Sequence, residues 1–159
     1  MIFVTLGSQK FQFDRLLKAL DELIAGGSEE LFAQTGYSDY KPKHFKYKNF
    51  LDRNEYDDMM NKADIVITHG GSGACIGAVK RGKKVIAVPR LAEYGEHVDN
   101  HQLELVSQFK ELNLIYECLD CNDLPKALQE IKSMAFSTYV SGTEKVIQSI
   151  ESHINELGV

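Results

Sequence analysis

Residues 63–73 read Ala-Asp-Ile-Val-Ile-Thr-His-Gly-Gly-Ser-Gly, and this stretch decides the fold. Its four consecutive β-branched residues, 65–68, predict a strand buried on both faces, because such strands are continuous apolar runs. Three glycines and a serine then make a tight turn, and residues 74–81 are predicted to be a helix that Gly82 ends. A buried strand that turns directly into a helix is typical of parallel α/β sheets.

The same alternation of strand and helix patterns runs through the rest of the chain. Further strands are predicted at residues 2–6, 31–34, 44–51, 85–88 and 114–116. Helices are predicted at residues 16–24, 55–62, 98–112, 123–135 and 139–157, the last with an apolar stripe of Val140, Ile147, Ile150, Ile154 and Leu157. This order predicts one α/β domain over residues 1–159, built on a doubly wound, Rossmann-like parallel sheet. Ligands of such sheets bind at the carboxyl ends of the strands.

The composition is that of an ordinary globular domain: 159 residues, 43% hydrophobic, 26% charged, with a net charge of −5. The acidic balance argues against nucleic acid as a partner, because phosphate binding needs clustered Lys and Arg. No apolar run approaches the roughly 18–20 residues of a membrane span, and the start lacks a signal-peptide pattern, so we expect a cytoplasmic protein. The CxxC pair Cys118 and Cys121 has no second pair beside it, which favours a structural role.

The glycine turn after the central strand is a candidate anion site. Backbone N–H groups at a helix N-terminus, free of bulky side chains, attract phosphate through the helix dipole. Ser72 and His69 can add side-chain donors to such a site. The alternative is a plain glycine turn with a capping serine and a hydrogen-bonded histidine, and the turn alone does not decide between the two. A P-loop is excluded because no Gly-Lys-Ser/Thr is present, and GxGxxG lacks its third glycine.

Two further polar turns are expected at the same sheet edge. Residues 88–102 follow a buried strand and carry six charged or histidine residues. Within them His97 and His101 stand four apart, but HExxH is absent and no third ligand is evident, so we predict no metal site. A polar loop leading into a capped helix is the alternative for this segment. Gly7 and Ser8 end the first strand, and three such turns at one edge predict a nucleotide-sized pocket.

At these residues the sequence resembles the carboxyl-terminal, donor-binding domain of GT-B glycosyltransferases of the family 28 type. The likeness is to small Alg13-type subunits and their bacterial capsule and exopolysaccharide counterparts. It is carried by residues 3–8, 63–73 and 96–105 and covers nearly the whole chain. The resemblance implies a UDP-sugar-binding domain that is a single half of a GT-B enzyme.

The resemblance also implies site residues by position. His69, as the catalytic residue, and the turn of Gly71 to Gly73 would hold the diphosphate, and the segment around Arg90 the uridine. Related domains often carry a ribose-binding Glu where this chain has Gly77, so Glu93 or Glu96 is the alternative ribose ligand. The implied substrate-binding set is Gly7, Ser8, Gly71, Ser72, Gly73, Arg90, Glu96, His97, Asn100, His101 and Gln102, of which Asn100, His101 and Gln102 would face the sugar.

The implied reaction is attack of an acceptor hydroxyl on the anomeric carbon, with fixed dipoles stabilising the departing UDP and no metal or cofactor required. The resemblance thus implies the catalytic, UDP-sugar-binding subunit of a two-component inverting glycosyltransferase in polysaccharide biosynthesis. Its partners would be a lipid-linked saccharide acceptor and a membrane-anchored, Alg14-like acceptor-binding subunit that recruits it to the cytoplasmic face of the membrane. The alternative is a non-catalytic nucleotide-binding α/β module, flavodoxin-like or regulatory.

Two segments are candidates for contact with such a partner. The first is the basic, aromatic-bearing stretch 41–48, for which a solvated edge strand is the alternative. The second is the apolar stripe of residues 139–157, for which packing on the chain's own sheet is the alternative.

Overall fold

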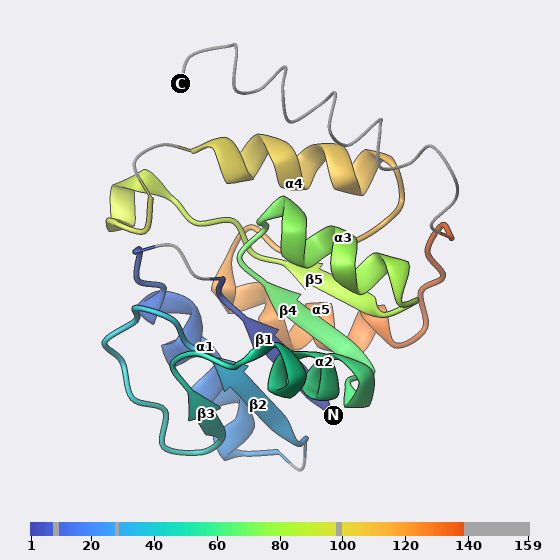
Figure 1. Ribbon diagram of the computed structural model, residues 1–159. Helices are drawn as coiled ribbons and strands as arrows, with labels where there is room; N and C mark the ends of the chain where they lie inside the picture. The colour runs from blue at the N-terminus through green and yellow to red at the C-terminus, as the bar shows by residue number, and fades with distance from the viewer. Residues whose placement is uncertain (8–9, 28, 98–99, 139–159) are drawn as a thin grey trace.

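The structure is a computed structural model that describes residues 1–7, 10–27, 29–97 and 100–138. In these residues six parallel strands form one sheet in the order β3-β2-β1-β4-β5-β6 (Figure 1). The strands are β1 (Ile2–Thr5), β2 (Leu31–Gln34), β3 (Lys46–Lys48), β4 (Ile65–Thr68), β5 (Lys84–Ala87) and β6 (Tyr116–Glu117). The predicted α/β class and doubly wound parallel sheet are confirmed.

Helices cover both faces of this sheet. They are α1 (Asp14–Ala25), α2 (Arg53–Lys62), α3 (Ser72–Lys80), α4 (His101–Glu111) and α5 (Leu124–Ile131), with short 3-10 turns η1 (Ala92–Tyr94) and η2 (Cys121–Asp123). Helices α1 and α5 lie on one face, and α2, α3 and α4 lie on the other (Figure 1). This layering follows from right-handed crossovers between parallel strands, which alternate faces where the strand order reverses.

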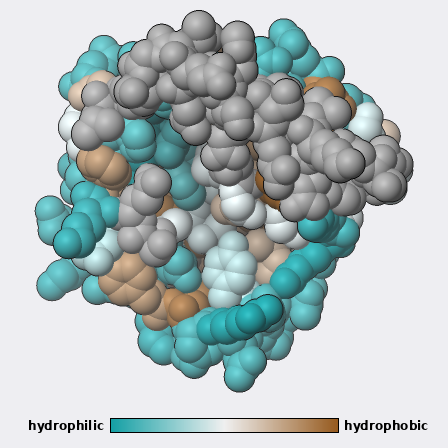
Figure 2. Space-filling model, turned by 45° about the horizontal axis from the view of Figure 1, so that its top comes forward, coloured by the Kyte–Doolittle hydropathy of each residue, from teal (hydrophilic) through white to brown (hydrophobic). Residues whose placement is uncertain are grey.

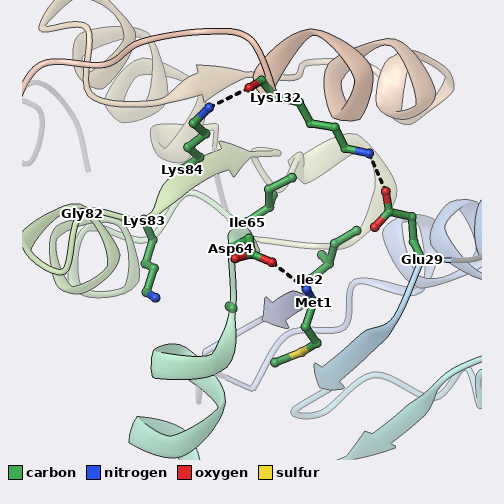
Figure 3. Close-up of a pocket in the computed structure, with 10 residues that line it drawn as sticks. Met1, Ile2, Glu29, Asp64, Ile65, Gly82, Lys83, Lys84 and Lys132 are labelled. Atoms are coloured by element: carbon green, nitrogen blue, oxygen red, sulfur yellow. Dashed lines mark hydrogen bonds and ion pairs between the residues drawn. The ribbon is translucent and has the colours of Figure 1, made fainter.

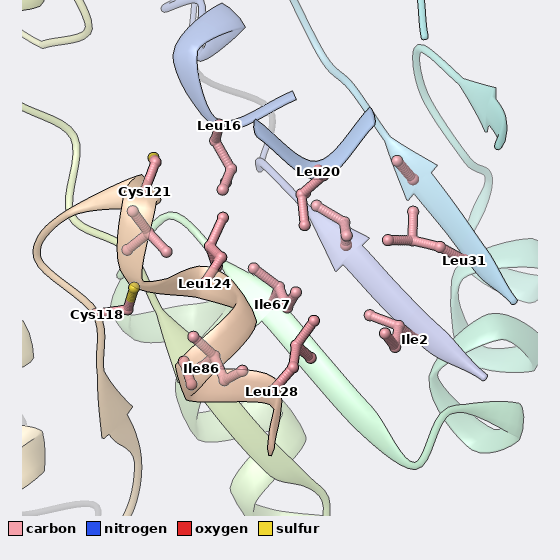
Figure 4. Close-up of a cluster of buried hydrophobic side chains, with 14 of the residues drawn as sticks. Ile2, Leu16, Leu20, Leu31, Ile67, Ile86, Cys118, Cys121, Leu124 and Leu128 are labelled. Carbon is pink, nitrogen blue, oxygen red and sulfur yellow. The ribbon is translucent and has the colours of Figure 1, made fainter. Parts of the chain in front are cut away.

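The central strands are buried on both sides because each contributes to two separate cores. On the α1 and α5 side, Ile2, Ile67 and Ile86 from three neighbouring strands pack with Leu16 and Leu124 (Figure 4). On the other side, residues such as Phe3, Val66 and Phe109 form the second core. Each fully buried side chain of this size contributes about 1.5–3 kcal/mol, so the two cores hold the strand ends rigidly.

Most sequence-based boundaries agree with the structure to within three residues, and three elements differ in length or position, among them the helix predicted at 123–135, which ends at Ile131. Strands 31–34 and 65–68 are confirmed at both ends, whereas the strand predicted at 44–51 shortens to the exposed edge strand β3. The strand predicted at 114–116 is misplaced. Leu114 and Ile115 are buried but close the end of α4, with Leu114 N–H donating to the Phe109 carbonyl, and pairing with β5 begins only at Tyr116. The predicted helix 139–157 lies outside the described residues.

The topological switch point of the sheet lies between β1 and β4. The chain leaves β1 toward β2 on one side and later returns to β4 on the other, so the connections diverge there. In open α/β sheets, ligands bind at such switch points, outside the carboxyl ends of the strands. The face turned forward in Figure 2 has a mainly hydrophilic rim, with exposed apolar residues in small separate groups. Within the described parts of the chain, no helix is long and apolar enough to cross a membrane.

Candidate functional site at the carboxyl edge of the sheet

The turn between β4 and α3 is built so that only glycine fits its tightest point. Gly70 has a φ of +86°, and a Cβ there would lie 2.6 Å from Val106 Cγ2 of α4. Gly71 is the N-cap of α3, and no side chain caps this helix end. The first N–H groups of α3 have no intrahelical acceptor, so this end of the helix favours an anion, as the sequence predicts.

The His69 side chain lies between the ends of β1 and β4, packed against two glycines. A Cβ on Gly7 would lie 2.9 Å from Cε1 of the ring, and a Cβ on Gly71 would overlap Nε2. The opposite ring nitrogen, Nδ1, lies 3.3 Å from Thr68 Oγ1. The Nε2 edge of the ring therefore faces both glycine turns at the switch point, and any side chain at Gly71 would displace it.

His69 is neutral at physiological pH. Only 6% of the residue is exposed, and burial lowers its pKa to about 3, with the positive charge of Arg90 acting in the same direction. A neutral imidazole has one N–H and one acceptor nitrogen. The ring can therefore give a phosphate oxygen a hydrogen bond but no positive charge.

Arg90 lies inside the protein rather than on the wall of the edge. The residue is 1% exposed, and its Nη2 donates to the carbonyls of Leu6 (2.9 Å) and Phe11 (3.1 Å). Its guanidinium carbon also lies 5.6 Å from the centre of the Phe13 ring. The buried side chain of Arg90 thus contacts the β1–α1 loop, and contact of the segment around Arg90 with a uridine stays a prediction.

Glu96 is likewise buried and engaged within the protein. Its two carboxylate oxygens each accept a hydrogen bond of 3.0 Å from Arg15 of α1, and Oε1 also accepts from Leu91 N–H. The ring of His97 packs at 4.8 Å on Phe11. These contacts fasten the β5–α4 loop to the β1–α1 loop and leave Glu96 no spare carboxylate surface for a ribose.

The residues expected to face the sugar start helix α4 at the same edge. Gln102 is 8% exposed, and its Oε1 accepts from Arg90 N–H at 3.2 Å. Asn100 is exposed, and its Oδ1 accepts from Ala92 N–H at 2.9 Å. His101 is the first residue of α4 and half-buried. Their place at the edge agrees with the expectation, while contact with a sugar stays a prediction.

Some of the expected site residues are described only in part. Ser8 lies outside the described residues, and for Ser72 only the backbone is described. Gly73 lies in the first turn of α3 with open space where a Cβ would stand. In the described part of the chain, no group of three or more His, Cys, Asp and Glu is arranged to hold a metal ion.

Sequence reasoning missed an aromatic pair at this edge. Tyr37 and Phe50 follow β2 and β3, with ring centres 5.1 Å apart and exposures of 45% and 42%. The pair adjoins the glycine turns: Gly36 N–H donates to the Asn49 carbonyl, and a Cβ on Gly36 would lie 3.1 Å from the Gly7 carbonyl oxygen. The available signal was an aromatic residue placed just after each strand.

The cysteines show no sign of redox chemistry at this edge. Cys118 and Cys121 are buried in the core on the α1 and α5 side. Burial raises the pKa of Cys118 to about 12, so its thiol stays protonated and unreactive near neutral pH.

Comparison with known proteins finds relatives of this chain in one family. The family model for the glycosyltransferase family 28 C-terminal domain matches residues 1–157. The human UDP-N-acetylglucosamine transferase subunit ALG13 is 33% identical over 127 residues, which is 72% of this chain, and the mouse protein of that name is 27% identical over 168 residues, covering 94%. The chain spans 11% and 13% of the length of these two relatives.

Solved structures share the fold at low identity. A solution structure of ALG13 superimposes with a TM-score of 0.63 at 16% identity, covering 97% of this chain and 96% of that one. The calicheamicin glycosyltransferase CalG4 superimposes with a TM-score of 0.62 at 16% identity, covering 98% of this chain and 38% of that enzyme. The chain thus shares its fold with the ALG13 solution structure and with part of CalG4.

Proposed function

The chain belongs to the glycosyltransferase family 28 C-terminal domain family, and from this premise we propose that it is the donor-binding subunit of a UDP-N-acetylglucosamine transferase. The proposal treats residues 1–159 as one donor domain. The observation that carries it is the meeting of His69 with the glycine turns after β1 and β4, at the switch point of the sheet. The choice of sugar nucleotide is extended from the name of the ALG13 relatives.

The donor lies along the carboxyl edge in this proposal. Its diphosphate binds the N-terminus of α3, where the Nε2 edge of His69 and the backbone of Gly71 and Gly73 meet it. The uracil lies on the exposed pair of Tyr37 and Phe50, because a flat base stacks well on an aromatic ring. Gly7 and Gly36 lie between the proposed diphosphate and uracil positions, and because they have no side chains they leave room for the ribose.

The reaction is transfer with inversion. An acceptor hydroxyl oxygen bonds to the anomeric carbon as the bond from that carbon to the UDP oxygen breaks, and UDP leaves with the bonding electron pair. The proposal assigns the ring proton of His69 to Nε2, where it hydrogen-bonds the departing diphosphate, and has Nδ1 accept from the Thr68 hydroxyl 3.3 Å away. No side chain of the described edge is assigned as the general base, so we place that base on the partner subunit.

The partner in this proposal is a membrane-anchored, Alg14-like subunit that binds a lipid-linked saccharide acceptor. The name of the relatives describes a transferase subunit, which supports an assembly of at least two chains. The partner would cover the carboxyl edge and hold this chain at the cytoplasmic face of the membrane. By likeness to the bacterial capsule and exopolysaccharide subunits of the family, we expect such a pair to act in polysaccharide biosynthesis.

Thermal melting with UDP, UDP-sugars, FMN and NAD tests the donor site. We expect UDP-N-acetylglucosamine and UDP to raise the melting temperature and FMN and NAD to leave it unchanged, because ligand binding to the native state stabilises it. A response to FMN alone would instead favour a flavodoxin-like module. Transfer to a lipid-linked acceptor is then assayed with and without the membrane-anchored subunit. Full activity of this chain alone would contradict the two-subunit proposal.

A further inference from the structure

We propose that Arg90 is a positioning residue that supplies the positive charge for the donor's diphosphate, a charge that His69 does not carry. The inference rests on the proposed function and deepens it. It assigns Arg90 an electrostatic role: the buried guanidinium attracts the diphosphate through its charge and does not contact the uridine.

Arg90 is held in place by three parts of the fold. It follows β5, its N–H donates to Gln102 of α4, and its guanidinium donates to the carbonyls of Leu6 and Phe11 in the β1–α1 loop. Neutral carbonyl oxygens and the Phe13 ring surround it, and no carboxylate pairs with it among the residues that the structure describes. The side chain is therefore fixed but not neutralised.

Two of the guanidinium nitrogens have no hydrogen-bond partner. Nε and Nη1 of Arg90 are the buried side-chain atoms left without one in the described residues. Native proteins leave few buried donors unpaired, because each has lost its hydrogen bonds to water. A buried cation with unused donors is costly to keep for stability alone, and an anion bound nearby would offset that cost.

Among the described residues, the charges around Arg90 leave one positive charge in excess. The Glu96 carboxylate raises the pKa of Arg90, but both of its oxygens accept hydrogen bonds from Arg15. Two guanidinium groups therefore share one carboxylate. Burial lowers the pKa of Arg90 to about 10, so the group remains charged at pH 7.

The Arg90 guanidinium lies beside the glycine turn that follows β1. Its Nη2 donates to the carbonyl of Leu6, the residue before Gly7, and a Cβ on Gly7 would lie 2.9 Å from Cε1 of His69. The charge of Arg90 also helps to lower the pKa of His69, to which His97 adds a smaller contribution. Since the attraction between charges is strong in a poorly hydrated interior, one fixed guanidinium there favours a diphosphate over an uncharged nucleoside.

The test compares Arg90→Gln, which removes the charge, with Arg90→Lys, which keeps it. Calorimetry measures the affinity of the whole chain for UDP and for uridine. We expect Arg90→Gln to weaken UDP binding about tenfold and uridine binding less than about twofold, with Arg90→Lys close to the wild type in the ratio of the two. Melting temperatures of both variants report whether the fold is retained.

A second measurement does not need a ligand. The titration of the His69 ring is followed by NMR, and its midpoint should rise in Arg90→Gln and stay near the wild-type value in Arg90→Lys. Equal losses of UDP and uridine affinity in both variants, or an unmoved His69 titration, would overturn the role of the charge. A wild-type chain that binds UDP no better than uridine would contradict the proposed function itself, whatever the variants do.

Discussion

The two ends of the sheet each carry several charged groups, but they differ in whether the polar atoms of these groups have hydrogen-bond partners. At the amino ends of β1, β4 and β5 lies a pocket of about 440 Å³ whose lining includes three lysines and two acids (Figure 3). Lys132 pairs with Glu29 at 2.5 Å, and Lys84 Nζ donates to the Lys132 carbonyl at 2.9 Å. Lys83 Nζ donates to the Asn61 carbonyl at 3.0 Å. Each of these ammonium groups thus has a hydrogen-bond acceptor within the protein.

At the carboxyl ends two of the functional groups, His69 and Arg90, are buried, and Arg90 is only partly hydrogen-bonded. His69 is enclosed and neutral, and Arg90 keeps two unpartnered donors. Glycines with positive φ, among them Gly7, Gly36 and Gly70, bring the backbone close to the same place. The contrast teaches that the proposed ligand-binding end of this sheet is distinguished by a buried cation with unpartnered donors rather than by the volume of a pocket.

The largest effect that separates the two ends is expected from His69→Ala. Losing a positioned donor to the departing diphosphate typically costs about 3–4 kcal/mol of transition-state stabilisation, a loss of roughly a hundred- to a thousandfold in turnover. Turnover is measured in the assembled two-subunit enzyme, with the melting temperature as a check on folding. Near-wild-type turnover would remove His69 from the catalytic role.

A pH titration of stability tests the burial of His69 directly. Its native pKa, lowered to about 3, lies below the ordinary value of 6.5, so the unfolded state takes up a proton that the native state refuses. Stability is therefore retained above pH 6.5 and falls as the pH drops toward 3. Between pH 6.5 and 5 we expect the wild type to lose about 1–2 kcal/mol more than His69→Gln does, measured by urea unfolding. Parallel curves for the two proteins would show that the ring is hydrated.

Local sequence patterns were sufficient for most of the fold because the deciding contacts are local or repetitive. Residues 65–68 form a β-branched run that is buried on both faces, and the strand is where the pattern predicts it. Leu114 and Ile115 have the same apolar character but serve to end α4. A short apolar run looks the same in the sequence whether it is a paired strand or only a buried segment, so the sequence could not distinguish the two cases.

The candidate site also has one part that the sequence predicts and one part that it does not. The glycine turn and His69 are consecutive in sequence, and their meeting at the sheet edge was predictable from strand order. The place of Arg90 depends on carbonyls of Leu6 and Phe11, 84 and 79 residues away. A carbonyl acceptor carries no residue-type signature, so no motif could have shown that this arginine is buried rather than open to a uridine.

Two glycines one turn apart on α3 give a smaller and sharper test of the carboxyl end. Neither Gly73 nor Gly77 has an atom within 4 Å of where a Cβ would stand. Alanine at either position should therefore stabilise the helix by about 0.5–1 kcal/mol. Only Gly73→Ala should weaken UDP binding, since the diphosphate is proposed to approach the first turn of the helix. Equal affinity in the two variants would place the ligand away from that turn.

The smallest effect is expected at the amino end, from Lys132→Ala. The side chains of Lys132 and Glu29 are 56% and 39% exposed, and exposed ion pairs contribute about 0.2–1 kcal/mol, a value that salt reduces further. Its matched partner variant, Glu29→Ala, completes a double-mutant cycle in urea unfolding, and the coupling energy should shrink as salt is added. UDP affinity and turnover should stay at the wild-type level in both variants, because the pair lies at the end of the strands opposite His69. A loss of UDP affinity in Lys132→Ala comparable to that in Arg90→Gln would break the contrast between the two ends, since it would show that a fully paired, exposed charge far from the glycine turns also serves the ligand.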